Sequence, residues 1–410
     1  MQIKNPSTAM PAAPILVMMA APDSGDRTIL GLSLLQRTAM VARRAGYEHV
    51  FLLAEQQVAP AGIATVSDWS RLVTALAKFR AAPLVIAPAT LLGELNWLEQ
   101  LAETRVDPSS WAAMPRCFIK IAAGRVPDAL ATLSEKSEAH DLRAVQDQLT
   151  RRLGPPEAIP ANIAPMIVTT AADVHVAERR LLRSLVKDTD GFMARHVERP
   201  ISLQIVRRLA STSVTPNQVT LISVAIGLAG APCFISALWP WQTFGALLFL
   251  VHSIVDGCDG ELARLRFQES RWGGVLDFWG DNVVHIATFA CMAVGWSLSV
   301  SATWPLWFGA AAVFGNAGSA ALVYWRQMRV KADSGPLFTS VSAESDRRLA
   351  WLLDAASRRD FIYLVLLLAL FGKSDWFLLL AALGAPVFFF LLVFLAMRER
   401  LPDVPSTSGI

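Results

Sequence analysis

The sequence predicts an N-terminal α/β domain followed by a C-terminal integral membrane bundle of six helices. Of the 410 residues, 53% are hydrophobic and only 17% are charged, whereas about a quarter of the residues of a soluble globular protein are charged. The two halves of the chain also differ. Short apolar runs alternate with amphipathic stretches up to about residue 165, and long apolar stretches dominate from residue 213 onward. A membrane protein with a soluble domain is therefore the first expectation.

Predicted strands and helices alternate in the N-terminal half. The short apolar runs at residues 14–20, 48–54 and 82–89 are typical of buried strands, and the amphipathic stretches at residues 34–46 and 68–79 are typical of helices. This alternation favours a parallel sheet with helices on both faces.

Residues 166–212 combine many arginines with interleaved Leu, Ile, Val and Phe. The pattern predicts amphipathic helices at a membrane surface, with the basic side chains facing lipid phosphates. The alternative is a solvated connector helix.

Six later stretches are candidate membrane spans, for which about 20 apolar residues are needed. The fifth is short, and its start before Asp360 is left open. The spans are roughly 217–238, 242–262, 274–299, 303–326, 360–372 and 375–397.

Charge along the chain predicts both the topology and the partners. Basic residues gather in alternate connections between the spans, so the positive-inside rule places both termini on the cytoplasmic side of a cytoplasmic or inner membrane. A net charge of +3 is too small to indicate nucleic acid. The four cysteines include no CxxC pair and predict neither a disulfide framework nor a zinc site. The predicted organisation is residues 1–165, a connector at 166–212, a membrane domain at 213–400 and a tail at 401–410.

Four aspartates lie beside the second and third spans, in the stretch "DGCDGELARLRFQESRWGGVLDFWGD". Asp256 and Asp259 share one helical face, and Asp277 and Asp281 share another. A helical hairpin would bring the two pairs together at its cytoplasmic end. One charged carboxylate at the centre of a membrane helix costs roughly 2.5–3.5 kcal/mol on insertion scales. Two magnesium or manganese ions would offset this cost and would favour a phosphorylated substrate. Helix caps or surface charges at span ends are the alternative.

The full pattern adds Gly260, Ala263, Arg264 and Gly273 to the four aspartates at fixed spacings. It resembles the signature of the CDP-alcohol phosphotransferase (CDP-alcohol phosphatidyltransferase) family of six-span membrane enzymes, over roughly residues 200–398. These are transferases in which the hydroxyl of an acceptor alcohol displaces CMP from a CDP-alcohol. The resemblance implies that Asp256, Asp259 and Asp277 bind the metal ions. Asp281 would be the general base and would also contact a metal.

The resemblance assigns the other residues of the pattern to the nucleotide. Gly260 and Gly273 would let it approach closely, Ala263 would leave it space, and Arg264 would hold the diphosphate. The segment "TPNQVT" also recurs in the family before the first span. By itself it predicts a helix start, with Thr215 as N-cap and Pro216 next. It would also supply Asn217 and Thr220 to the nucleotide pocket.

The acceptor is expected to contact basic residues between the fourth and fifth spans. In family members that use inositol phosphate, such residues hold the acceptor's phosphate. Arg326, Arg329 and Arg359 are the candidates here, although the positive-inside bias alone also places arginines there. A homodimer is usual in the family.

The order of the domains resembles that of the bifunctional inositol-phosphate cytidylyltransferase/di-myo-inositol-phosphate phosphate synthases. The N-terminal half would then be a nucleotidyltransferase-like, Rossmann-like domain. It departs from the active pattern because Pro22 replaces the first glycine of the phosphate-binding loop, no lysine follows, and no acidic residue accompanies "VIAPATLL". We therefore expect a degenerate domain that serves as a scaffold, nucleotide sensor or docking platform.

The expected function is phospholipid or inositol phosphodiester synthesis from a CDP-lipid or a soluble CDP-alcohol. Two other classes stay open: an inactive membrane anchor for the α/β domain, and a cation transporter with intramembrane aspartates. Metal-dependent binding of CMP would distinguish the enzyme from both.

Overall fold

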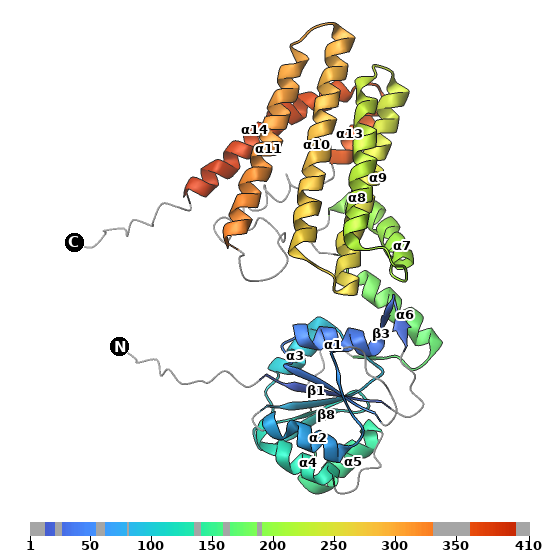
Figure 1. Ribbon diagram of the computed structural model, residues 1–410, viewed down its shortest axis with the longest axis vertical. Helices are drawn as coiled ribbons and strands as arrows, with labels where there is room; N and C mark the ends of the chain where they lie inside the picture. Colours follow the sequence, from blue (N-terminus) through green and yellow to red (C-terminus); the bar gives the residue numbers. More distant parts are fainter. Residues whose placement is uncertain are drawn as a thin grey trace, which may run out of the picture. The chain divides into compact units, whose positions relative to one another are not determined.

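The computed structural model describes residues 13–20, 27–54, 62–79, 82–134, 141–158, 165–186, 191–330 and 361–398. The chain separates into two compact units, Met1–Leu181 and Leu182–Ile410. Figure 1 shows the first as a sheet covered by helices and the second as a bundle of long helices.

The first unit is built on a seven-stranded sheet with the order β10-β8-β9-β6-β1-β4-β5. Three apolar strands form its parallel centre, with Val17 of β1 in register with Phe51 of β4 and Ile86 of β6. The strands are β1 (Ile15–Met19), β4 (His49–Leu53), β5 (Ala64–Val66), β6 (Leu84–Pro88), β8 (Trp111–Met114), β9 (Phe118–Ile121) and β10 (Glu157–Ala158). Two small antiparallel pairs lie apart from it: β2 (Thr28–Ile29) with β3 (Leu32–Ser33), and β7 (Leu91–Leu92) with β11 (Met166–Ile167).

The prediction of a parallel sheet is wrong in one strand, because β9 runs antiparallel to both β6 and β8. Only Pro115, Arg116 and Cys117 separate β8 from β9. A parallel connection needs a crossover of about a dozen residues or more. A link of this length can therefore only form a hairpin between antiparallel strands. Arg116 completes the turn with a φ of 64°.

Helices cover both faces of this sheet, as the alternation predicts (Figure 1). Val17 and Met19 face one core together with apolar residues of α2, α4 and α5. Leu16 and Met18 are also fully buried, although their side chains point to the opposite face. This explains the continuous apolar runs of the central strands. The helices of the unit are α1 (Leu34–Arg44), α2 (Trp69–Leu76), η1 (Ala77–Phe79), α3 (Leu95–Glu103), η2 (Ala123–Arg125), α4 (Val126–Ser134) and α5 (Leu142–Leu153).

The predicted connector is helical. It contains α6 (Ala171–Arg183), a π-helical turn η3 (Ala194–Glu198) and α7 (Arg199–Leu209). The helices of the second unit that follow it are α8 (Pro216–Gly230), η4 (Ala231–Ile235), α9 (Trp239–Arg266), α10 (Arg271–Val300), α11 (Pro305–Val330), α13 (Phe361–Leu370) and α14 (Ser374–Arg398).

Four segments of the second unit are long and apolar enough to cross a membrane: Pro216–Ile235, Arg271–Val300, Pro305–Arg326 and Ser374–Met397. They indicate an integral, multi-pass membrane protein. The other two predicted spans are also helical. However, α9 is not among the four, and α13 is a short apolar helix.

Exposed tryptophans lie near both ends of these helices. Trp239, Trp307 and Trp376 lie at or near the starts of α9, α11 and α14, whereas Trp272 and Trp325 belong to the opposite end of the bundle. Tryptophan is enriched at the two interfaces of a membrane, so this distribution is consistent with a bundle that spans it.

Candidate active site

The helices α9 and α10 form a hairpin that carries all four aspartates of the motif. Helix α9 ends at Arg266, where Phe267 takes a left-handed conformation with a φ of 58°. Ser270 then caps α10 by accepting a hydrogen bond from the Gly273 N–H. This tight connection keeps the end of α9 next to the start of α10. The prediction of a helical hairpin is confirmed.

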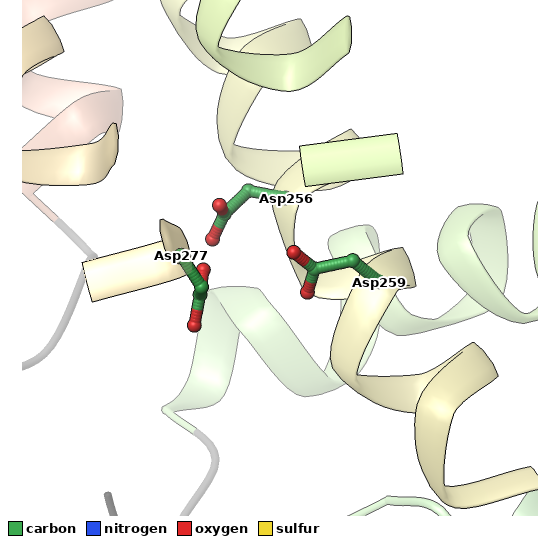
Figure 2. A group of neighbouring side chains, drawn as sticks. All are labelled: Asp256, Asp259 and Asp277. Carbon is green, nitrogen blue, oxygen red and sulfur yellow. The ribbon is translucent and has the colours of Figure 1, made fainter. Parts of the chain in front are cut away.

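Three aspartates come together at this end of the hairpin. One carboxylate oxygen from each of Asp256, Asp259 and Asp277 lies within 4.8 Å of the other two. Figure 2 shows Asp256 and Asp259 extending from one helix toward Asp277 on the other. Asp256 and Asp259 are only 2% and 6% exposed. Buried charges need a compensating partner, because low-dielectric surroundings penalise an isolated ion.

The donor set fits a hard divalent cation. Carboxylate oxygens are the ligands that magnesium and manganese prefer, and a cation would relieve the mutual repulsion of these three carboxylates. The arrangement can therefore hold divalent metal and, through it, phosphate oxygens.

The fourth aspartate, Asp281, has a different neighbour. It lies one helical turn after Asp277 on α10, and its Oδ1 is 3.4 Å from Nε2 of His252 on α9. Its side chain is 19% exposed, so it combines a fixed contact with access to the site.

Two residues of the "TPNQVT" segment also reach the motif. Thr215 caps α8, as predicted, and the structure adds a reciprocal capping box with Gln218. The buried Thr220 hydroxyl donates to Oδ2 of Asp259. A Cβ added at Gly273 would lie 2.9 Å from Oδ1 of Asn217. Thr220 therefore supports a carboxylate of the cluster, and Asn217 lies against Gly273.

The remaining predicted residues are placed only in part. Ala263 and Arg264 are half-buried on α9, and a Cβ added at Gly260 would lie 3.3 Å from an Nη of Arg264. Arg326 is half-buried near the end of α11. The side chain of Arg329 and all of Arg359 lie outside the described residues.

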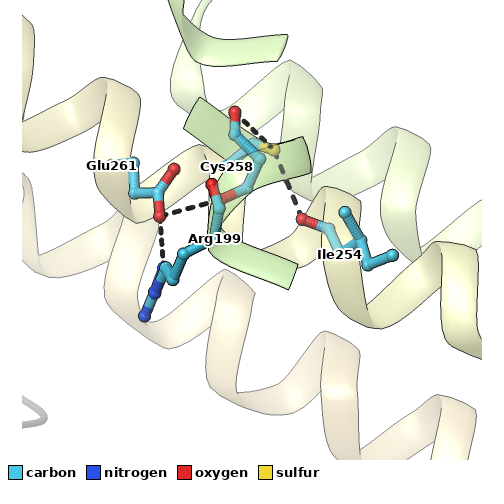
Figure 3. A network of polar contacts seen from close by, with 5 residues as sticks. Arg199, Ile254, Cys258 and Glu261 are labelled. Atoms are coloured by element: carbon cyan, nitrogen blue, oxygen red, sulfur yellow. Dashed lines mark hydrogen bonds and ion pairs between the residues drawn. The ribbon is translucent and has the colours of Figure 1, made fainter. Parts of the chain in front are cut away.

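A polar network on the other side of α9 was not predicted from the sequence (Figure 3). The Glu261 carboxylate is fully buried, and its Oε1 accepts hydrogen bonds from Arg199 and, at 3.1 Å, from the Ser202 hydroxyl. Cys258, one turn earlier, contacts the carbonyl oxygens of Ser202 and Ile254 through its sulfur. These contacts hold α7 against the helix that carries Asp256 and Asp259.

His252 was also missed. It lies four residues before Asp256, so it shares that residue's helical face. A histidine inside an apolar span on the aspartate face was the available signal.

The C-terminal part of the chain matches a known family. The family model described as CDP-alcohol phosphatidyltransferase covers residues 213–384, which include the hairpin and all four aspartates. The C-terminal part is a CDP-alcohol phosphatidyltransferase domain. The signature identified in the sequence is thus confirmed.

Curated relatives match this chain over part of its length. The "Bifunctional IPC transferase and DIPP synthase" of Rubrobacter xylanophilus is 36% identical over 192 residues, which are 45% of this chain and 41% of the relative. The protein of the same description from Thermococcus kodakarensis is 36% identical over 127 residues, 31% of this chain and 28% of the relative. The matched stretches thus span less than half the length of these relatives.

A solved structure of Mycobacterium tuberculosis phosphatidylinositol phosphate synthase (PgsA1) with CDP-DAG bound aligns to 52% of this chain and 99% of its own. The two are 19% identical, and the TM-score is 0.35.

Proposed function

We propose that the protein is a membrane CDP-alcohol phosphotransferase. It would transfer a phospho-alcohol group, phosphatidyl or phosphoinositol-type, from a CDP-alcohol to an acceptor hydroxyl and release CMP. The observation that carries this proposal is the cluster of Asp256, Asp259 and Asp277, with Asp281 one turn away, in a domain of the CDP-alcohol phosphatidyltransferase family. The product would be a phospholipid or an inositol phosphodiester.

The reaction is a displacement at phosphorus. The acceptor oxygen forms a bond to the β-phosphorus of the donor, and the bond from that phosphorus to the bridging oxygen breaks. CMP leaves with the bridging oxygen. Asp281, partly exposed beside the cluster, accepts the proton of the acceptor hydroxyl, which a general base must do within hydrogen-bond reach.

Asp256, Asp259 and Asp277 would hold the divalent ions, magnesium or manganese, and Asp281 would contribute a further oxygen. When bound, two such ions neutralise the charge that develops on the phosphate oxygens. The residues themselves fix the position of the site, because they project from two helices joined by a tight turn.

The proposed substrate contacts come from the α9–α10 hairpin, from α8 and from the segments that follow α10. Asn217, Thr220, Gly260, Ala263, Arg264 and Gly273 would form the nucleotide pocket. The proximity of Asn217 to Gly273 and of Gly260 to Arg264 supports it. Arg326, Arg329 and Arg359 would bind a phosphate of the acceptor. Thr220 would act through Asp259, to which it donates.

The proposed organisation keeps the boundaries predicted from the sequence. The α/β domain (1–165) is nucleotidyltransferase-like and degenerate, the connector (166–212) lies at the membrane surface, and the six helices of residues 213–400 span the membrane as a homodimer with cytoplasmic termini. Exposed Phe192 and Ile201, with Arg208 on α7, support the surface location of the connector. Pro22, in the degenerate loop, lies outside the described residues.

The deciding experiment measures CMP release by the purified full-length protein in liposomes with manganese or magnesium. CDP-diacylglycerol and CDP-inositol are offered separately, each with inositol phosphate, glycerol phosphate or a lipid extract as acceptor, and Asp281→Asn serves as control. Release from CDP-diacylglycerol that the variant loses would make the protein a phospholipid synthase. Release from CDP-inositol alone would make it an inositol phosphodiester synthase.

A protein that releases no CMP from any CDP-alcohol and shows no metal-dependent CMP binding would refute the proposal. The membrane anchor and the cation transporter would then be the remaining candidates.

A further inference from the structure

His252 joins three helices at the candidate site. It lies on α9, is 2% exposed, and makes a polar contact from each ring nitrogen. Nδ1 is 2.9 Å from the carbonyl oxygen of Ser223 on α8, and Nε2 is 3.4 Å from Oδ1 of Asp281 on α10. A carbonyl oxygen only accepts hydrogen bonds, so Nδ1 carries a proton and donates it. That bond fixes the ring plane and directs Nε2 at the carboxylate.

The surroundings hold the ring in this position. A Cβ added at Gly227 of α8 would lie 3.0 Å from Cγ of His252 and 2.5 Å from Cγ1 of Val284. Because Gly227 has no side chain, α8 can pack closely against both the His252 ring on α9 and Val284 on α10. On α9, the Phe249 ring stacks on the imidazole at a centroid distance of 6.0 Å. His252 is therefore confined by its neighbours as well as by its hydrogen bond.

A carboxylate at the end of a short side chain rotates freely unless its oxygens are held, and an error of about 1 Å in a reacting group costs roughly 100-fold in rate. Contact with Nε2 restricts this rotation for Asp281 by holding Oδ1. The second oxygen can then keep a constant orientation toward the acceptor hydroxyl.

We propose that His252 is a positioning residue that orients the Asp281 carboxylate for transfer of the acceptor's proton. The inference rests on the proposed function, because it assigns His252 a role in that reaction. It predicts an effect on kcat and little effect on the binding of CMP and metal, for which Asp256, Asp259 and Asp277 supply the clustered carboxylates.

Two substitutions separate the contacts of the ring. In His252→Asn the amide nitrogen approximates Nδ1, so the bond to Ser223 can persist while the contact with Asp281 is lost. In His252→Gln the amide nitrogen approximates Nε2, so the contact with Asp281 can persist. His175→Asn, in an exposed histidine of α6, is the matched control for the substitution itself.

The measurements are kcat and KM for CMP release, together with metal-dependent CMP binding. We expect His252→Asn to lower kcat about 100-fold with the donor KM within about threefold of wild type, and His252→Gln to restore kcat to within about tenfold of wild type. Adding His252→Asn to Asp281→Asn should cause no further loss, because residues that act as one unit are not additive.

Equal losses in the two His252 variants, a change confined to KM, or full additivity with Asp281→Asn would overturn the inference while wild-type CMP release still supports the function. An inactive wild-type protein would overturn both. If His252→Asn does not fold, His252→Leu replaces it, because leucine fills a similar volume and has no polar atom to contact Asp281. That variant should likewise lose kcat and keep CMP binding, and unchanged kcat would refute the inference.

Discussion

The pair formed by Arg199 and Glu261 allows a quantitative test of how α7 supports the site. Glu261 is fully buried, and Arg199 is only 16% exposed, so solvent screens the pair weakly. Replacing Arg199 with methionine removes the cation that donates to this buried carboxylate, which costs about 3–5 kcal/mol. Glu261→Gln keeps an oxygen that accepts from Ser202 and leaves the charge on the more exposed partner. Its cost should be about 1.5–3 kcal/mol, the value of a charge-assisted hydrogen bond.

The double variant Arg199→Met/Glu261→Gln should lose less than the sum of the single losses, with a coupling energy of about 1–3 kcal/mol. The assay is the free energy of unfolding of the full chain in mixed micelles with increasing SDS. Arg208→Met, which alters an exposed arginine of the same helix, is the control and should stay within about 0.5 kcal/mol of wild type. A loss below about 1 kcal/mol in Arg199→Met, or strict additivity in the double variant, would show that the pair does not hold α7 on α9.

Four further predictions follow from individual contacts. Asp256→Asn and Asp277→Asn should each weaken manganese binding, measured by calorimetry. The loss should be at least about 10–100-fold, which is the effect of removing a residue that only supports a metal ligand. EDTA should abolish CMP binding. Gly315→Ala should cost about 1–3 kcal/mol or more, because its Cβ would lie 2.3 Å from the backbone of Ala385. Gly384→Ala should change the free energy of unfolding little, because the added Cβ has no atom within 4 Å outside its own stretch of helix. Arg266→Met should destabilise the chain by about 1.5–3 kcal/mol, because the guanidinium donates to carbonyls at and just after the end of α7, those of Leu209, Ala210, Thr212 and Val214. An unchanged midpoint of SDS unfolding would contradict this. Hydrogen bonds from the Thr170 and Thr169 backbone lower the pKa of Asp173 to about 2. The ionised Asp173 therefore stabilises the start of α6 above about pH 4, and this stabilisation is lost as the pH falls toward 2. The difference in the free energy of unfolding between wild type and Asp173→Asn should shrink over that pH window.

The strand–helix alternation correctly predicted the central elements of the first unit, because β1, β4 and β6 are apolar on both faces and α1 and α2 are amphipathic. It could not predict the direction of β9. The direction of a strand depends on the length of the connection that precedes it and on the strand with which it pairs. Neither property is encoded in the apolar runs themselves.

For the site, the spacing of the aspartates determined much from the sequence alone. Helical periodicity places Asp256 with Asp259 and Asp277 with Asp281, and the short link forces the two helices to be neighbours. Cluster formation by Asp256, Asp259 and Asp277 was therefore predictable. The contact of Asp281 with His252 was not, since it depends on the rotation of α9 and α10 about their axes.

The sequence by itself determined that the chain has an α/β part and a membrane part, and which residues could hold divalent metal, because composition and periodicity are local properties. Only the tertiary structure decided what surrounds them. Thr220 on Asp259, His252 on Asp281 and Arg199 on Glu261 join residues that are 29 to 62 positions apart. Such pairs form because helices pack at particular rotations and distances, with Gly227 allowing the close approach at His252, and no local pattern encodes that geometry.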